Sequence, residues 1–196
     1  MEGIIDFMKL FPPLSTFQTV LIIIIIIPTL IALITGAPWV PTPKDRVRKM
    51  LELAKIKKGE KVFDLGCGDG RLVHLASIEH GANATGFELS PLIFVLATFL
   101  RPSYWLKGSR ARICFKNFYR VDLKEADVIV TYLLPHAMRR VQKKCEKELK
   151  KGARVVSYAF PITDWTPIHR QKRNRKKQYG PIWVYEMGKH QSKKTI

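Results

Sequence analysis

A glycine-rich turn between a predicted strand and a predicted helix restricts the fold of this chain more than any other feature. The apolar pattern of residues 61–65 contains Asp64, and glycines follow at Gly66, Gly68 and Gly70 before a helical pattern begins. Glycine is favoured where the backbone turns sharply and where a ligand approaches it closely. The amides that begin the next helix point toward such a ligand. Because ligands of open α/β sheets bind beyond the carboxyl ends of the strands, we expect a binding site at this turn.

The spacing of acidic residues around the turn indicates which ligand it binds. Glu88 ends the next predicted strand, twenty residues beyond Gly68, where a carboxylate can accept hydrogen bonds from ribose hydroxyls. The turn has the pattern D-x-G-x-G-x-G, which departs from the G-x-G-x-x-G pattern of dinucleotide sites. Asp64 would be unfavourable beside a pyrophosphate but suits the cationic amino-acid end of S-adenosylmethionine. The sequence therefore favours S-adenosylmethionine over a dinucleotide, with a purely structural turn as a third alternative.

Strand and helix patterns alternate along the chain after residue 42. Strands are predicted at residues 61–65, 84–88, 111–115, 127–133 and 154–160, and helices at residues 70–80, 90–100 and 136–151. Such alternation predicts a parallel sheet covered by helices on both faces. Residues 167–170 and 182–187 are predicted to close it as an antiparallel pair. We expect a Rossmann-like, doubly wound α/β domain at residues 39–190, followed by a short tail at 191–196.

An uncharged, apolar stretch precedes this domain. No charged residue occurs between Lys9 and Lys44, and residues 22–27 are six consecutive isoleucines. About 20 apolar residues in a helix can cross a bilayer, which predicts a transmembrane helix at residues 14–38 after an N-terminal segment of residues 1–13. A cleaved signal peptide is the alternative, but the acidic residues near the N-terminus disfavour it. Trp39 stands where an interfacial aromatic residue is expected.

The charge distribution predicts an orientation and a class of partner. The net charge is +18, and residues 1–42 carry −1, so the remainder carries +19. Cations are concentrated after the apolar stretch, which predicts a single-pass membrane protein with its catalytic domain on the cytoplasmic side. Six cations lie in the turn at residues 170–177, and we expect them to contact anionic lipid rather than nucleic acid, which stays an alternative. The three cysteines have no metal-like spacing, so no metal site is predicted.

Residues 39 to about 167 resemble the seven-strand, class I methyltransferases that use S-adenosylmethionine. In particular, they are similar to small archaeal and bacterial protein-lysine methyltransferases. Those are related to the mitochondrial lysine methyltransferases that act on the ATP-synthase c-subunit and on the adenine nucleotide translocase. The resemblance is carried by residues 40–43, 64–71, 88, 117–119, 132–135 and 154–157, with Phe160 and Trp165.

This resemblance implies a cofactor site. Its members would be Thr42, Asp64, Gly66, Gly68, Asp69, Gly70, Arg71, Glu88, Asn117 and Phe118. Asp64 and the first two glycines would surround the methionine part, Glu88 would bind the ribose, and Asn117 and Phe118 would flank the adenine. Many relatives have Asp in place of Asn117, but an amide can still bond the adenine amino group. Thr42 would lie in a loop over the methionine end, or would only cap the following helix.

Tyr132 is the candidate catalytic residue, because it ends the central predicted strand. There it could line the acceptor pocket and hold an amine by cation–π contact, or only pack against its neighbours. We expect a membrane-anchored protein-lysine methyltransferase, in which the basic domain helps to deprotonate the acceptor lysine. A methyltransferase for RNA, lipid or a small molecule, and a non-catalytic basic binding domain on the same scaffold, are the alternatives.

Overall fold

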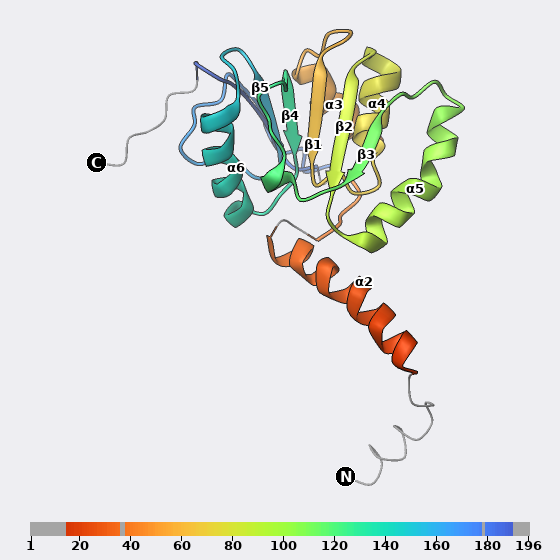
Figure 1. Cartoon of the computed structure of the whole chain (residues 1–196). Helices are drawn as coiled ribbons and strands as arrows, with labels where there is room; N and C mark the ends of the chain where they lie inside the picture. Colours follow the sequence, from red (N-terminus) through yellow and green to blue (C-terminus); the bar gives the residue numbers. More distant parts are fainter. Residues whose placement is uncertain (1–14, 36–37, 178, 190–196) are drawn as a thin grey trace.

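The computed structural model describes residues 15–35, 38–177 and 179–189. The predicted N-terminal segment at residues 1–13 and the predicted tail at residues 191–196 lie outside the described residues. Figure 1 shows a sheet covered by helices on both faces, with helix α2 (Thr16–Thr35) extending from one end of it.

The sheet has seven strands in the order β3-β2-β1-β4-β5-β7-β6. Their bounds are β1 Lys61–Leu65, β2 Asn83–Glu88, β3 Arg112–Phe115, β4 Val128–Thr131, β5 Arg154–Tyr158, β6 His169–Gln171 and β7 Ile182–Glu186. Strands β1 to β5 pair in parallel, and β7 pairs antiparallel with both β5 and β6. The predicted Rossmann-like sheet with a closing antiparallel pair is therefore confirmed. The strand order reverses at β1, whose neighbours are β2 and β4, and this is where open sheets bind ligands.

Two apolar cores hold the layers together, one on each face of the sheet. Alternate residues of one strand enter opposite cores: Val128 and Val130 of β4 face α3 and α4, whereas Ile129 faces α6. All three are fully buried, as expected for a central parallel strand. This arrangement leaves the strand ends at the edge of the core to form the site.

The helices of the domain are α3 Lys44–Leu53, α4 Arg71–His80, α5 Pro91–Trp105 and α6 Pro135–Glu148, with a short 3₁₀ turn at Phe118–Arg120. Ser90 caps α5, because its hydroxyl accepts a hydrogen bond from the Ile93 amide. Helix α5 continues beyond the predicted end near residue 100, although Pro102 lies inside it. The added turn is held by Tyr104, whose ring stacks on His74 at 4.3 Å, a contact that no local pattern reveals.

The structure does not confirm the transmembrane helix that the sequence predicts at residues 14–38. Among the residues that the structure describes, no helix is both long enough and apolar enough to cross a membrane. The helix covers Thr16–Thr35, and part of it contacts α5 of the α/β domain. The Thr29 hydroxyl lies 3.3 Å from the Ser90 hydroxyl at the start of α5. His136 Nε2 lies 2.8 Å from the carbonyl oxygen of Ile34.

Candidate active site

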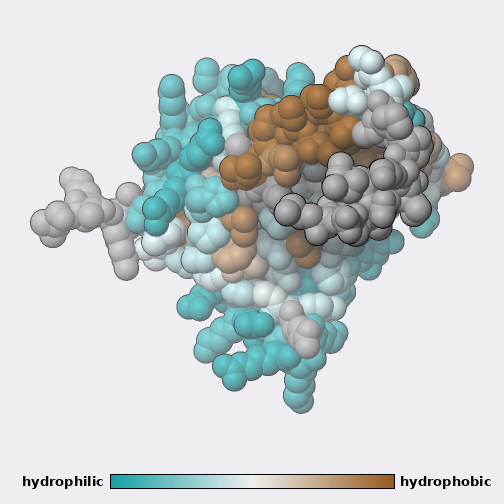
Figure 2. Space-filling view, turned by 90° about the horizontal axis from the view of Figure 1, so that it is seen from below, coloured by the Kyte–Doolittle hydropathy of each residue, from teal (hydrophilic) through white to brown (hydrophobic). Residues whose placement is uncertain are grey.

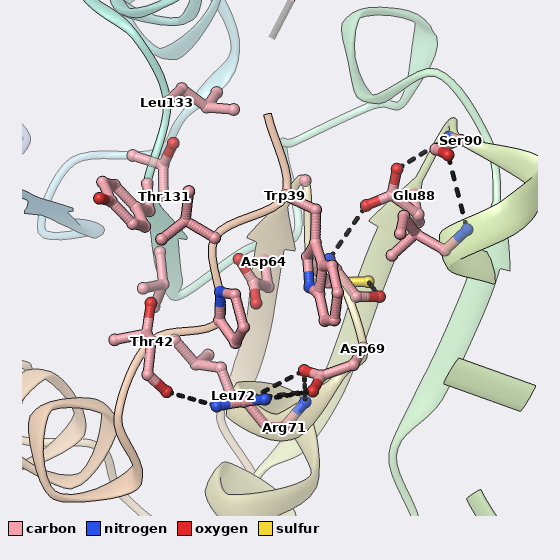
Figure 3. A pocket seen from close by; sticks show the side chains of 18 of the residues that line it. Trp39, Thr42, Asp64, Asp69, Arg71, Leu72, Glu88, Ser90, Thr131 and Leu133 are labelled. Atoms are coloured by element: carbon pink, nitrogen blue, oxygen red, sulfur yellow. Dashed lines mark hydrogen bonds and ion pairs between the residues drawn. The ribbon is translucent and has the colours of Figure 1, made fainter. Parts of the chain in front are cut away.

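A pocket lies at the carboxyl ends of β1 and β4, where the strand order reverses (Figure 3). It is lined by the turn after β1, by the ends of β2 and β4, by the residues after β3, by Thr29 of α2 and by the segment that joins α2 to α3. We call residues 38–42 of that segment the connecting segment. The predicted site residues that line the pocket are Thr42, Asp64, Gly66, Gly68, Asp69, Arg71, Glu88, Asn117, Phe118 and Tyr132.

The turn after β1 needs glycine at the two positions nearest the pocket. Gly66 and Gly68 have φ angles of +81° and +57°, in the region where L side chains are strained. A Cβ atom at Gly66 would lie 3.2 Å from a methyl of Leu133, and one at Gly68 would lie 2.7 Å from the Trp39 indole. The Gly66 amide donates to the carbonyl of Phe87 at 3.0 Å, which ties the turn to β2.

Glu88 is held in one orientation by three backbone amides. Its Oε2 accepts from Gly68 at 3.0 Å, and its Oε1 accepts from Leu89 at 2.9 Å and Ser90 at 2.8 Å. Burial raises the pKa of Glu88, and the three amide donors oppose that rise. Each carboxylate oxygen can accept more than one hydrogen bond, so a rigid Glu88 can also accept two hydroxyl groups of a ribose.

Asp64 is a buried acid that the protein itself does not neutralise. Its exposed fraction is 6%, and within the described residues no hydrogen bond stabilises its charged form. Burial, followed by the charges of Glu88 and Asp69, raises the pKa of Asp64 to about 8. A buried carboxylate without a partner is costly unless a ligand supplies a positive charge. The site therefore fits the ammonium and sulfonium groups of S-adenosylmethionine, with Glu88 placed for the ribose.

Asp69 and Arg71 form an ion pair that organises the pocket wall. Arg71 Nη2 lies 2.5 Å from Asp69 Oδ2, and Arg71 Nε donates to Asp69 Oδ1 at 2.9 Å. The same guanidinium donates through Nη1 to the carbonyl oxygen of Thr42 at 2.8 Å. This pair therefore neutralises Asp69 and fastens one end of the connecting segment.

The pocket lining decides against Gly70 as a lining residue and against the alternative that Thr42 only caps a helix. Gly70 does not line the pocket: it is the N-cap of α4 with φ +78°, and a Cβ there would lie 2.2 Å from Ile113. Thr42 does not cap α3, because that helix starts after Pro43 without a side-chain cap. Thr42 instead lines the pocket, and its carbonyl is held by Arg71.

The residues expected around the adenine follow β3. Asn117 and Phe118 both line the pocket, and Phe118 is buried. The side chain of Asn117 accepts from the Tyr119 amide at 3.0 Å, which fixes it at the start of the 3₁₀ turn. Their contact with adenine stays a prediction.

Tyr132 follows the last residue of β4 and forms part of the opposite wall. Its ring meets the Tyr158 ring edge-on, with centroids 4.8 Å apart. Burial, and then Tyr158, raises the pKa of Tyr132, so the phenol stays neutral at physiological pH. The Tyr132 ring, backed by the buried Tyr158 ring, is therefore an aromatic wall of the pocket that can hold an amine.

The sequence did not predict that Trp39 and Ser90 belong to the pocket. Trp39 was expected at a membrane interface, but its indole lies on Gly68 inside the pocket wall. Ser90 was predicted only as the first residue of a helix. A helix-start serine beside the acidic end of a strand was the available signal for Ser90, whereas no local pattern connects Trp39 with Gly68.

Comparisons with known proteins agree with this geometry. Residues 64–169 match the protein family described as the ANTKMT methyltransferase domain. The chain is 38% identical over 154 residues to a protein-lysine N-methyltransferase of Saccharolobus islandicus, covering 78% of this chain and 95% of that protein. It is 33% identical over 162 residues to the adenine nucleotide translocase lysine N-methyltransferase of Mus musculus, covering 81% of this chain and 66% of the mouse protein.

A solved structure shares both the fold and the cofactor chemistry. An RNA methyltransferase from Salinibacter ruber in complex with S-adenosyl-L-homocysteine superposes with a TM-score of 0.68 at 29% identity, covering 76% of this chain and 94% of that chain. The predicted cofactor, S-adenosylmethionine, is thereby confirmed. On the family match, the archaeal relative and the pocket at the strand reversal, the chain belongs to the ANTKMT methyltransferase domain family of class I, S-adenosylmethionine-dependent methyltransferases.

Proposed function

We propose that this enzyme methylates the side-chain nitrogen of lysine residues in proteins. The observation that carries this proposal is the similarity to the Saccharolobus islandicus protein, which is named as a protein-lysine N-methyltransferase. The two sequences are 38% identical over 95% of that protein's length. The aromatic wall of Tyr132 and Tyr158 supports it, because aromatic rings attract the positive charge that develops on an amine during methylation. The similarity to an RNA methyltransferase keeps RNA as the second acceptor class to be tested.

The chain's own residues have mainly to orient the acceptor and exclude water. The cofactor supplies an activated methyl group, so alignment of the two reactants provides most of the catalysis. A lysine acceptor must first lose its proton, and its ordinary pKa is about 10.4. The buried Arg46 lies behind the aromatic wall, with its guanidinium carbon 5.6 Å from the Tyr158 ring centroid. Its positive charge favours the neutral form of an amine held at Tyr132.

Methyl transfer into cell extract tests the acceptor class directly. The enzyme is incubated with extract and with cofactor labelled on the methyl group, and aliquots are then treated with protease or with nuclease. We expect the label to be lost with protease and to map to lysine by mass spectrometry. An Asp64→Asn variant, which should not bind the cofactor tightly, serves as the negative control for methyl transfer. Label lost with nuclease alone would refute lysine methylation.

We also propose that the enzyme works at a membrane, with its catalytic domain on the cytoplasmic side. Helices α2 and α5 expose many apolar side chains, and Figure 2 shows a hydrophobic area on the face that carries α2. The exposed apolar residues are Phe17, Val20, Leu21, Ile22, Ile23, Ile24, Ile26, Ile27, Leu30, Ile31 and Ile34 on α2, and Leu92, Val95, Phe99, Leu100 and Trp105 on α5. Apolar areas of this extent are typical of interaction surfaces, and the basic turn at residues 170–177 could bind anionic headgroups.

Flotation with vesicles tests this surface. Replacing Ile24 and Ile27, which are 58% and 50% exposed, by Ser should reduce binding to vesicles that contain anionic lipid. Replacing two surface residues of the basic turn, Lys172 and Arg173, by Gln should reduce binding only at low salt. Equal flotation of all variants would argue against a membrane surface.

A further inference from the structure

The connecting segment is a wall of the cofactor pocket that lies outside the matched family domain. All five of its residues, from Pro38 to Thr42, line the pocket, whereas the family match begins at residue 64. It follows α2 along the chain, and only Gly36 and Ala37 separate it from the last residue of that helix. Only two residues of the chain therefore join α2 to this wall of the pocket.

Trp39 is the member of this segment that reaches the glycine turn. Its indole occupies the space that a Cβ atom on Gly68 would fill, with Cδ1 at 2.7 Å and Nε1 at 2.8 Å from that position. Gly68 is also the residue whose amide binds Glu88. Figure 3 shows the indole between the side chains of Asp64 and Glu88 in this view. A large aromatic ring thus lies where both the ribose carboxylate and the cation-binding carboxylate face the pocket.

Contacts at both ends determine where this ring lies. At one end, Arg71 binds the carbonyl of Thr42 at 2.8 Å. At the other end, α2 contacts the domain through Thr29 and Ser90, whose hydroxyls are 3.3 Å apart, and through Ile34 and His136 at 2.8 Å. Thr29 and Ser90 themselves line the pocket. If α2 left the domain, the second set of contacts would be lost and Trp39 would be held from one end only.

We propose that Trp39 is a cofactor-binding residue, and that contact of α2 with the starts of α5 and α6 controls cofactor binding and release by holding Trp39 over the pocket. The flat indole provides apolar area and a π-face for the cationic cofactor. Because the connecting segment covers the pocket, the cofactor leaves faster when α2 is detached and more slowly when α2 is held. By linkage, cofactor binding equally favours the attached position of α2.

The role of Trp39 is tested by calorimetry with S-adenosylhomocysteine on the full chain. Trp39→Ala should weaken binding about tenfold or more, whereas Trp39→Phe, which keeps an aromatic face, should retain most of the affinity. Trp105→Ala is the matched control, because Trp105 is half-exposed on α5 and does not line the pocket. The proposal is overturned if Trp39→Ala binds as tightly as the parent, or if the Trp105 variant loses as much affinity.

The role of α2 is tested with one variant that fixes α2 to the domain and one that weakens its contact with the domain. A Thr29→Cys, Ser90→Cys variant brings two sulfurs within reach of a disulfide, because the present hydroxyls are 3.3 Å apart. In the oxidised form we expect S-adenosylhomocysteine to dissociate at least tenfold more slowly than from the same protein after reduction. His136→Ala removes the contact with Ile34 and should speed dissociation about fivefold, the effect of one hydrogen bond.

Stopped-flow displacement of the bound ligand gives these rates without any measurement of methyl transfer. Peptide mapping by mass spectrometry identifies the oxidised pair, and comparison of the same protein before and after reduction controls for the substitutions themselves. Equal dissociation rates in the oxidised and reduced forms, together with an unchanged rate in His136→Ala, would show that α2 does not control the pocket. This result would leave the assignment of the cofactor site itself intact.

Discussion

Substituting Asp64 with Asn should make the protein more stable without cofactor, yet unable to bind the cofactor tightly. Burial and the neighbouring carboxylates raise the pKa of Asp64 to about 8 from an ordinary value of 3.8. In the unfolded chain this group is ionised at pH 7, so folding requires it to take up a proton. Each pH unit between 3.8 and 7 costs about 1.4 kcal/mol, or about 4 kcal/mol in all. Asparagine has the same shape and needs no proton.

The stability difference between the parent and Asp64→Asn should depend on pH in one direction. A carboxyl group with a raised folded-state pKa contributes fully to stability below its unfolded pKa, and this contribution is lost as the pH rises toward the folded pKa. The advantage of Asp64→Asn should therefore be close to zero near pH 4, reach about 4 kcal/mol at pH 7 and level off above pH 8. For a chain of this size, about 4 kcal/mol corresponds to a melting temperature roughly 8–16 °C higher.

Urea denaturation of the parent and the variant at several pH values measures this difference. Asp122→Asn is the matched control, because Asp122 is an exposed carboxylate that accepts the Lys124 backbone amide at 2.9 Å, an interaction that asparagine can keep, and lies 3.7 Å from the Lys124 ammonium. We expect no pH-dependent gain from it. A difference for Asp64→Asn that does not change between pH 4 and pH 8, or a variant less stable than the parent at pH 7, would refute the reasoning. The cofactor affinity of Asp64→Asn should fall, because a buried neutral amide cannot balance the ligand's positive charge.

Three further substitutions test other parts of the site. Glu88→Gln should weaken binding of S-adenosylhomocysteine at least about tenfold in calorimetry, since hydrogen bonds to a charged group are the stronger ones, and unchanged affinity would contradict the ribose assignment. Gly68→Ala should lower the free energy of unfolding by about 1–2 kcal/mol, because the φ angle of Gly68 is +57° and the added methyl would meet Trp39. A urea midpoint equal to that of the parent would show that the turn tolerates a side chain. Tyr132→Ala should raise the KM for a lysine peptide about tenfold, whereas Tyr132→Phe should stay within about twofold; equal losses in both would mean that the hydroxyl, not the ring, matters.

The local sequence predicts the elements that build the cofactor site. The turn after β1 follows from glycine at positions with positive φ, and the buried strands follow from short apolar runs. Glu88 could be placed at a strand end because its strand and the next helix are both marked by local patterns. Each of these features depends on residues that are neighbours along the chain, so the sequence alone was sufficient to identify a class I methyltransferase pocket.

Only the tertiary structure decided how the walls of that pocket are made. Trp39 contacts Gly68 from 29 positions away, and Arg71 holds the carbonyl of Thr42 from an equal separation. The apolar stretch that predicts a transmembrane helix forms α2, which bonds to the start of α5 through Thr29. No periodicity encodes such contacts, because they depend on which surfaces meet after the sheet has formed. Local torsional preference and apolar spacing therefore determine where the cofactor site lies, and packing between distant segments determines what covers it.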